Sequence, residues 1–245
     1  RPGTMTEHLP KQSPAGKSKR ALAADGRMYF SYAQIHETVS KAVPAIQAFR
    51  PDVILAIGGG GYIPARMLRT EVRVPILAIS LELYDDATKT ANAQVIRRQW
   101  FDETGTGAKV PGGRVLIVDE VDDTRTTLQY AVEELRKDHA PAAIATFVVH
   151  NKDKPKKGVL PPDVTMIVGE EIPGWWACYP WDAAAYGHTV REHEALAKQC
   201  ALEHDDKRRE AGAEAEHPAI FGGHVSSVAA MQYALIGFAP MAHIM

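Results

Sequence analysis

Residues 115–128 read VLIVDEVDDTRTTL, and this stretch carries the clearest structural signal in the chain. Its first four residues are apolar and mostly β-branched, as is typical of a strand buried on both faces of a parallel sheet. An acidic pair and a short polar stretch follow. Residues 128–137 then carry apolar side chains at helical spacing. The stretch therefore predicts a strand, an acidic elbow, a hydroxyl-rich loop and the start of a helix.

The loop between this strand and this helix has the properties of an anion site. The first N–H groups of a helix have no partner within the helix, and the helix dipole places positive charge at the same end. Thr124, Thr126 and Thr127 add hydroxyl donors. Asp119 and Glu120 come directly before the loop and can accept hydrogen bonds from the hydroxyls of a sugar. The residues thus indicate one ligand that carries both a diol and a phosphate.

The glycine run Gly58, Gly59, Gly60 and Gly61 follows a second apolar stretch, residues 53–57. Consecutive glycines let the backbone approach a ligand closely and present successive N–H groups to an anion. The spacing does not match the GxGxxG pattern of dinucleotide-binding folds. We therefore expect a second anion-binding loop here.

The rest of the chain alternates predicted strands and helices. We expect a helix capped by Ser31 and kinked or split at Pro44. Further strands are expected at 53–57, 75–80, 97–100, 143–150 and 164–168, and further helices at 62–69 and 128–137. This alternation predicts an α/β fold with an open, mainly parallel twisted sheet flanked by helices. Ligand-binding loops should gather at the carboxyl ends of its strands.

Length and composition favour one globular enzyme domain with appendages. The chain has 245 residues and a formal charge of −2, so nucleic acid is not an expected partner. Its two cysteines, Cys178 and Cys200, show no zinc or disulfide spacing, which favours a reducing, cytoplasmic compartment. We expect a flexible segment over 1–26, the α/β domain over 27–190 and a helical C-terminal extension, solvated in its first part, over 191–245. The apolar end of that extension is interrupted by Ser, Gln and Pro, so no membrane span is expected.

The strand, acidic pair and Thr-rich loop resemble the phosphoribosyl-pyrophosphate (PRPP) motif of the type I phosphoribosyltransferases. The stretches IGGGGYIPAR, HNKDKPK and CYPWDA are similar to the fungal hypoxanthine-guanine and xanthine enzymes in particular. The resemblance covers residues from about 28 to about 189. It implies the type I phosphoribosyltransferase fold with a hood segment, residues 170–182. It also implies transfer of the phosphoribosyl group from PRPP to a 6-oxopurine, with Mg²⁺ as cofactor, in a homodimer or homotetramer.

The resemblance assigns the sugar, the proton and the phosphates to named residues. It implies that Asp119 and Glu120 bind the ribose hydroxyls and that both lie, with Asp182, near Mg²⁺. It makes Asp123 the general base at the purine N7, with Asp122 as the competing candidate. The pyrophosphate is placed at the glycine run. The residues implied for the 5-phosphate are Asp123, Thr124, Arg125, Thr126 and Thr127.

The purine side is assigned in the same way. Lys152, just past a predicted strand, is implied to donate to the 6-oxo group, and Trp176 to stack on the base. Ala177 offers backbone groups to the base edge, close to Asp182. Tyr84 belongs to the segment 83–100, which corresponds to a flexible loop that closes over the reacting centre. The neighbouring Lys154, Lys156 and Lys157 are expected at the surface, because a lysine run is usually solvated.

Two questions stay open at the level of sequence. A regulator that senses PRPP without catalysis is the alternative function, but it would not need Asp123, Lys152 and Trp176, which are all present. The base can be xanthine, hypoxanthine or guanine. HNKDKPK and CYPWDA favour xanthine-using relatives, whereas the glycine run favours the hypoxanthine-guanine enzymes.

Overall fold

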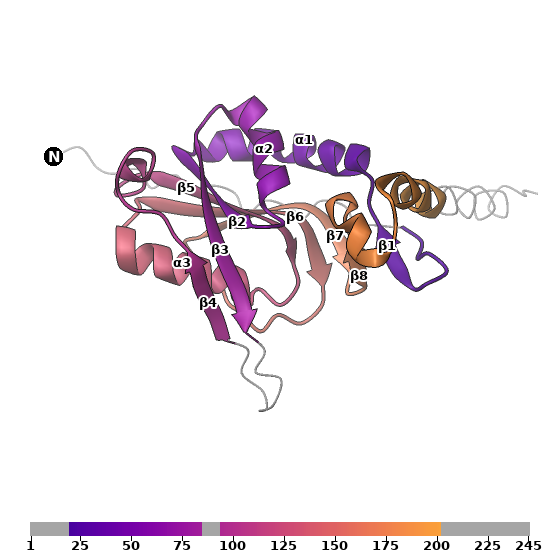
Figure 1. Ribbon diagram of the computed structural model, residues 1–245. Coiled ribbons are helices and arrows are strands. Elements are labelled where there is room, and N and C mark those ends of the chain that lie inside the picture. The colour runs from indigo at the N-terminus through magenta and orange to yellow at the C-terminus, as the bar shows by residue number, and fades with distance from the viewer. Residues whose placement is uncertain (1–19, 85–93, 202–245) are drawn as a thin grey trace, which may run out of the picture. The chain divides into compact units, whose positions relative to one another are not determined.

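The structure is a computed structural model that describes residues 20–84 and 94–201 (Figure 1). The chain divides into two units, Arg1–Lys207 and Arg208–Met245, and every described residue belongs to the first. Within the described ranges, no helix is long and apolar enough to cross a membrane.

A six-stranded sheet forms the centre of the first unit. Its strand order is β4-β3-β2-β5-β6-β7; β4 runs antiparallel to β3, and all other neighbours are parallel. The open, mainly parallel sheet predicted from the sequence is confirmed. The strands are β2 (Val53–Gly58), β3 (Ile76–Tyr84), β4 (Gln94–Gln99), β5 (Arg114–Asp122), β6 (Ala143–Asp153) and β7 (Thr165–Pro173).

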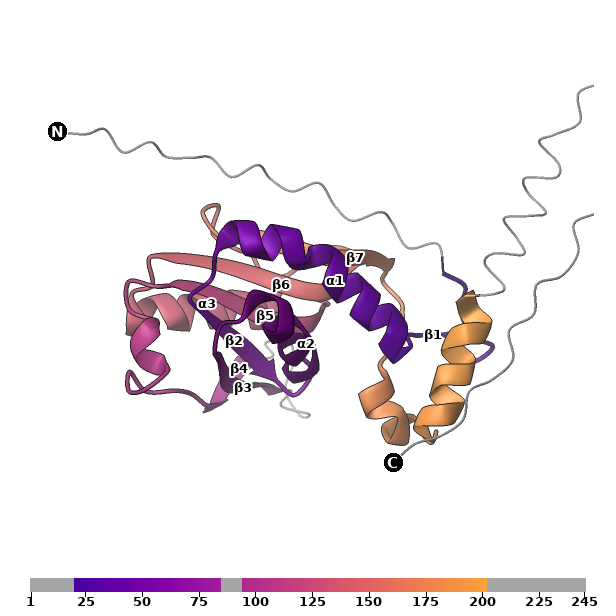
Figure 2. The same cartoon turned by 90° about the horizontal axis from the view of Figure 1, so that it is seen from above.

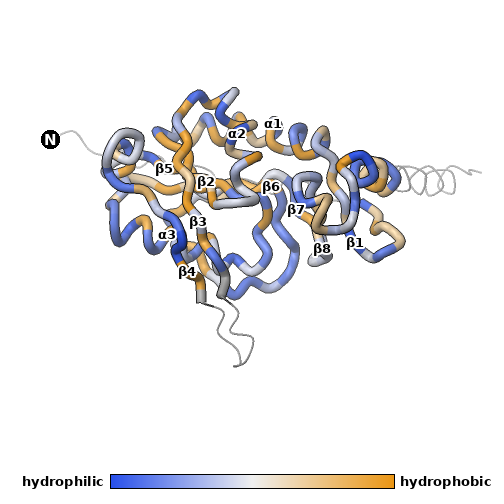
Figure 3. The backbone as a smooth tube through the Cα atoms, in the orientation of Figure 1, coloured by the Kyte–Doolittle hydropathy of each residue, from blue (hydrophilic) through white to orange (hydrophobic). Residues whose placement is uncertain are grey.

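Helices cover both faces of this sheet (Figures 1 and 2). α1 (Tyr32–Phe49) and α2 (Tyr62–Val72) pack on one face and α3 (Thr126–His139) on the other, and a 3₁₀ helix, η1 (Gly107–Lys109), precedes β5. Successive residues of β2 serve opposite faces: Ile54 packs on the α1–α2 side and Leu55 on the α3 side. Because side chains alternate along a strand, a strand covered on both faces is apolar throughout. Figure 3 shows this apolar colour along β2, β3 and β5.

α1 begins as predicted. The Ser31 hydroxyl accepts a hydrogen bond from the Gln34 N–H at 3.1 Å, and the Gln34 side chain accepts one from the Ser31 N–H at 2.9 Å. This capping box satisfies two backbone donors at the helix start. Pro44 lies inside a helix that continues to Phe49, so the helix is not split there.

A second sheet pairs segments from near the two ends of the described chain. β1 (Arg27–Tyr29), which the sequence did not reveal, runs parallel to β8 (Trp176–Cys178) in the hood, and the 3₁₀ helix η2 (Pro180–Tyr186) follows. A helix then occupies residues 190–201. This part of the expected solvated helix has an exposed face, but it also has one buried face, which includes His193 and Cys200.

Three predicted segments fall partly outside the described residues. Of the expected C-terminal extension over 191–245, only residues up to 201 are described, and its apolar end lies outside them. Of the expected flexible segment 1–26, only residues from 20 on are described. The Arg20 guanidinium there lies 4.9 Å from the ring centre of Phe30 and 3.7 Å from the Glu170 carboxylate. Of the expected lid, residues 85–93 lie outside the described ranges, whereas the returning strand is confirmed as β4.

Candidate active site

The acidic pair lies at the carboxyl end of β5 and still belongs to the strand, which continues to Asp122. The main-chain N–H of Glu120 donates to Asp119 Oδ1 at 2.9 Å. Burial, reinforced by the neighbouring charge of Glu120, raises the pKa of Asp119 well above its usual value. Glu120 Oε2 is buried and has no hydrogen-bond partner in the described chain. Such oxygens can accept hydrogen bonds from sugar hydroxyls or serve as ligands of a hard cation.

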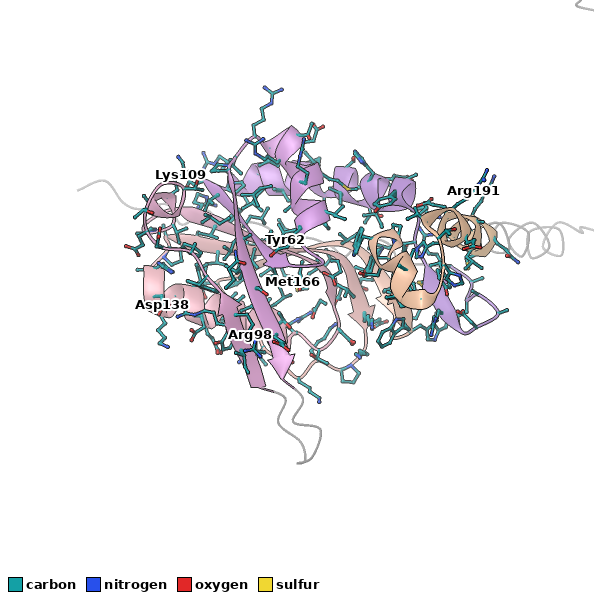
Figure 4. All side chains as sticks on the ribbon, viewed as in Figure 1. Tyr62, Arg98, Lys109, Asp138, Met166 and Arg191 are labelled. Atoms are coloured by element: carbon teal, nitrogen blue, oxygen red, sulfur yellow. The ribbon has the colours of Figure 1, made fainter. Side chains whose placement is uncertain are left out.

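The glycine run lies directly against this pair. A Cβ atom on Gly60 would sit 1.4 Å from Glu120 Oε2, and one on Gly61 would sit 2.3 Å from the main-chain oxygen of Val118. Glycine at these positions is therefore what lets the loop approach the acids. The Gly58–Gly59 peptide bond is cis. Tyr62, which Figure 4 labels, follows the glycine run and is the first residue of α2. The structure thus brings the predicted pyrophosphate loop and the predicted ribose acids together.

A pocket of about 180 Å³ lies beside the acids at the amino end of α3. The helix starts at Thr126, and the residue before it, Arg125, has a left-handed backbone with φ 67°. The Thr124 and Thr126 hydroxyls are 2.7 Å apart. Four of the five residues predicted for the 5-phosphate line this pocket, and Thr126 joins them through its bond to Thr124. The lining residues are Asp119, Val121, Asp122, Asp123, Thr124, Arg125, Thr127 and Leu128.

The two candidate bases differ sharply in their surroundings. The Asp122 side chain is wholly buried, and its Oδ2 accepts hydrogen bonds from Arg125 Nε at 2.9 Å and Nη2 at 2.8 Å. The Asp123 side chain is 43% exposed and pairs with Lys152 and Lys154. Burial alone would raise the pKa of Asp123, but the hydrogen bonds from Lys154 and Lys152 outweigh it and hold that pKa below its usual value. The Asp122 carboxylate is therefore buried and bound to Arg125, whereas the Asp123 carboxylate is ionised and accessible to a ligand.

Three lysines of the HNKDKPK stretch point toward these acids. Lys152 lies within β6 rather than just past it. Its Nζ is 3.1 Å from Asp123 Oδ2 and 5.9 Å from the ring centre of Trp176. The expectation that Lys156 is a surface lysine is wrong, because its side chain is only 13% exposed. Lys154 is partly exposed, and its ammonium pairs with Asp123. Lys157 is exposed, as expected.

Comparison with known proteins places this geometry in a family. The family described as "Phosphoribosyl transferase domain" matches residues 32–184, more than half of the chain. The chain belongs to the phosphoribosyltransferase family. Xanthine phosphoribosyltransferase 1 of Saccharomyces cerevisiae is 42% identical to it over 208 residues, which cover 72% of this chain and 98% of that protein. Hypoxanthine-guanine phosphoribosyltransferase of Schizosaccharomyces pombe is 41% identical over 196 residues, covering 69% and 93%.

Solved structures agree with this assignment of the phosphoribosyltransferase fold. A hypothetical protein from Neisseria gonorrhoeae with bound ppGpp is 34% identical with a TM-score of 0.63, covering 70% of this chain and 96% of that chain. A purine phosphoribosyltransferase from Pyrococcus horikoshii is 24% identical with a TM-score of 0.51, covering 64% and 93%, and shows the shared fold.

The hood of this phosphoribosyltransferase presents an aromatic surface beside Lys152. Trp176 is 61% exposed, and Ala177, the next residue of β8, is in register with Met28 of β1. Asp182 lies in η2, where burial and then the charge of Glu120 raise its pKa. The structure therefore brings Trp176 to Lys152 and places Asp182 within the electrostatic influence of the acidic pair.

A buried cluster of three rings, His150, Phe30 and Tyr179, joins the hood to the acids of the phosphoribosyltransferase, and it was not identified from the sequence. The His150 ring stacks on Phe30 with ring centres 3.9 Å apart, and its Nδ1 is 2.8 Å from the Tyr179 hydroxyl. That hydroxyl lies 3.4 Å from the main-chain oxygen of Glu120. Trp181 stacks on Tyr179 at 4.8 Å. The sequence held one signal for this group, the density of aromatic residues in the hood, and none for His150.

Two assignments made from the phosphoribosyltransferase resemblance remain, the loop residue Tyr84 and the Mg²⁺ site. Tyr84 is the last residue of β3, and its side chain lies outside the described part of the chain. No three His, Cys, Asp or Glu side chains among residues 20–84 and 94–201 are arranged to hold a metal ion by themselves. The carboxylates of Asp119 and Glu120, with the unpartnered Glu120 oxygen, nevertheless fit a Mg²⁺ ion that takes its other ligands from a substrate.

Proposed function

We propose that this protein transfers the 5-phosphoribosyl group of PRPP to a 6-oxopurine, giving a purine nucleoside 5'-monophosphate and pyrophosphate in purine salvage. One observation carries the proposal. Asp123 lines the pocket at the amino end of α3, and its carboxylate also lies 3.1 Å from Lys152 Nζ, beside the exposed ring of Trp176. A phosphate site and a planar-base site thus meet at one ionised carboxylate. The identity to xanthine and hypoxanthine-guanine phosphoribosyltransferases over most of the chain supports this reading.

The PRPP side uses three neighbouring elements. Asp119 and Glu120 accept hydrogen bonds from the ribose hydroxyls, and the 124–127 loop donates to the 5-phosphate through backbone N–H groups and threonine hydroxyls. The glycine run, packed against Glu120, binds the pyrophosphate through its backbone. When bound, Mg²⁺ neutralises charge on the leaving pyrophosphate. Asp119, Glu120 and Asp182 are the carboxylates near which it would be held.

The purine side uses Lys152, Trp176 and Asp123. Trp176 stacks on the base, and Lys152 donates to its 6-oxo group, leaving the hydrogen bond that it makes to Asp123. The purine N9 bonds to the ribose C1 as the bond from C1 to pyrophosphate breaks, and Asp123 accepts the proton from N7. In the free protein the two lysines hold the pKa of Asp123 below its usual value, so its carboxylate is ionised. When Lys152 turns to the 6-oxo group, Asp123 loses one of these hydrogen bonds and becomes a better proton acceptor. A positioned base of this kind contributes roughly 10²–10⁴-fold in rate.

The direct test is release of pyrophosphate from PRPP in the presence of Mg²⁺ and one base at a time. We expect release with at least one of xanthine, hypoxanthine and guanine. Adenine is the matched control, because its 6-amino group offers a donor where Lys152 requires an acceptor, and we expect no release with it. PRPP binding without release for any base would contradict the proposal and favour a PRPP-sensing regulator.

A further inference from the structure

The segment Lys156–Gly158, which we call the brace, lies behind the phosphate-binding loop and contacts it through several consecutive residues. Lys156 Nζ donates to the main-chain oxygen of Asp122 at 2.7 Å and to that of Asp123 at 3.0 Å. The main-chain N–H groups of Lys157 and Gly158 both lie 3.0 Å from the oxygen of Thr124. The carbonyl groups of three consecutive residues, 122, 123 and 124, are therefore all bound by the brace.

The direction of these carbonyl groups matters for an anion site. A carbonyl oxygen carries partial negative charge and repels a phosphate, whereas the N–H groups of a helix start attract it. The pocket already contains the carboxylates of Asp119 and Asp123. Because the brace binds the three carbonyl oxygens on its own side, it keeps them from turning toward the ligand.

The Lys156 ammonium is built into the structure. Its side chain is 13% exposed, and its three N–H donors face the two carbonyl oxygens and the Asp122 carboxylate, which is 3.5 Å away. The same carboxylate oxygen binds Arg125, the residue with φ 67° directly before α3. One buried acid thus connects the brace to the turn that starts the helix.

Gly158 allows the backbone of the brace to contact the backbone of Arg125 and Thr126 directly. A Cβ atom there would lie 2.5 Å from the Arg125 oxygen and 2.9 Å from the Thr126 nitrogen, so a side chain has no room. The contact is therefore backbone on backbone at Thr124 and Arg125, whereas the Lys156 side chain makes the contact at Asp122 and Asp123.

We propose that Lys156 is a positioning residue that fixes the phosphate-binding loop in its anion-binding conformation and so sets the affinity for PRPP. The inference rests on the proposed function for its substrate, but its central requirement, tight binding of a sugar phosphate, can be measured without turnover. Lys156 contacts the main chain of Asp122 and Asp123 and the buried Asp122 carboxylate, so we expect its main effect on the phosphate side.

The test compares Lys156→Met with Lys157→Met, which removes an equal charge from an adjacent, exposed side chain and keeps the main-chain N–H by which Lys157 belongs to the brace. For Lys156→Met we expect the KM for PRPP to rise about tenfold, as loss of a buried charged hydrogen-bond donor implies, while the KM for the purine changes less than about threefold. Lys157→Met should keep both values, and Lys156→Arg, which keeps the charge and donors, should recover most of the affinity for PRPP.

A second measurement separates this inference from the proposed function. Ribose 5-phosphate should raise the thermal unfolding midpoint of the wild type and of Lys157→Met, but much less that of Lys156→Met. Equal ribose 5-phosphate stabilisation and equal KM for PRPP in the two methionine variants would overturn the inference even if the enzyme is fully active. If Lys156→Met does not fold, Lys156→Gln is measured in its place against the same controls, and values equal to wild type again overturn it.

Discussion

The phosphate side and the base side of the site are held in different ways. On the phosphate side, the 122–124 carbonyls are bound by the brace, and Asp122 joins Lys156 to Arg125. On the base side, the hood is held by stacked rings and by the three-residue pairing of β1 with β8. The first region is fixed mainly by polar contacts to backbone, and the second mainly by burial of aromatic surface.

Because of this difference, we expect the KM for PRPP and the KM for the purine to respond to different mutations. Polar contacts to backbone fix the direction of individual groups, which is what an anion site requires. Stacked rings fix the plane of a bound base but let the base slide within that plane, which is sufficient to hold a planar ligand. Asp123 with its lysines connects the two regions through side chains, and the Tyr179 hydroxyl reaches the main-chain oxygen of Glu120 at 3.4 Å. Single changes away from these groups should therefore affect mainly PRPP or mainly purine.

The largest effect is expected where the two sides meet. Asp123→Asn removes the proton acceptor while keeping the shape of the side chain, so kcat should fall roughly 10²–10⁴-fold. The KM for PRPP should change little, because the loop N–H groups and threonines remain. Asp163→Asn, at an exposed carboxylate paired with Arg136 at 2.6 Å, is the control and should behave as wild type. Wild-type turnover in Asp123→Asn would remove the assignment of the base.

On the phosphate side, two adjacent glycines should separate activity from folding. In Gly60→Ala the new methyl group meets the end of the flexible Glu120 side chain, so Glu120 moves while the fold stays intact. Misplacing a group that binds the reacting ribose should lower kcat/KM by about 10²-fold. In Gly61→Ala the methyl group meets backbone oxygens at 2.3 and 2.7 Å, which should cost about 1–3 kcal/mol of stability. Steady-state kinetics and urea unfolding of both variants check this pair, and equal losses of stability would contradict it.

On the base side, Tyr179→Phe keeps the stacked ring and removes the hydroxyl that contacts His150 and the Glu120 oxygen. Loss of this buried hydrogen bond should cost about 1 kcal/mol. If that loss loosens the hood, the KM for the purine should rise about fivefold, and the KM for PRPP should rise less, because the lost contact is to the main chain of Glu120 and not to its carboxylate. A rise in the KM for PRPP as large as that for the purine would show that the two sides are not separable.

The smallest effect concerns acid. Burial lowers the pKa of His150, although the nearby Glu170 carboxylate opposes this. Below about pH 6.5, His150 therefore binds a proton in the unfolded chain but not in the folded chain. Its contribution to the free energy of unfolding is complete above that pH. As the pH drops, the free energy of unfolding falls by up to about 1.4 kcal/mol per pH unit. Urea unfolding at pH 7.5 and 5.5 should show this loss in the wild type and in His36→Gln, an exposed control, but a smaller loss in His150→Gln. The same loss in all three proteins would exclude His150 as its source.

The elements that the sequence predicted are those built from neighbouring residues. The β5 strand, its acids, the threonine loop and the start of α3 form one continuous stretch, and the glycine run follows β2 in the same way. Their strand and helix periodicities differ clearly, and both stretches carry the family motif. The parallel direction of most neighbouring strands follows from this alternation, because parallel strands are joined by crossover connections, whereas the order of the strands in the sheet was not predicted.

The elements that it did not predict depend on contacts between distant segments. β1 is only three residues long and is defined by its pairing with β8, about 150 residues later. His150 continues an apolar strand, and only the fold places Tyr179 beside it. The lysine stretch was misread because charge runs are usually solvated. β6 instead extends past Lys152, so this lysine faces the site from within the strand, and Lys154 and Lys156 follow it to Asp123 and Asp122.

The pairing of β1 with β8 also means that the family match and the folding unit have different limits. The match begins at residue 32, after β1, Phe30 and the packed Arg20, and ends at residue 184, before the helix over 190–201 that buries His193 against Tyr29. A protein trimmed to the matched residues would keep every motif residue yet lose the strand that supports Trp176. We therefore expect that substitutions in β1, outside the matched residues, can change purine binding without altering a single residue of the motif.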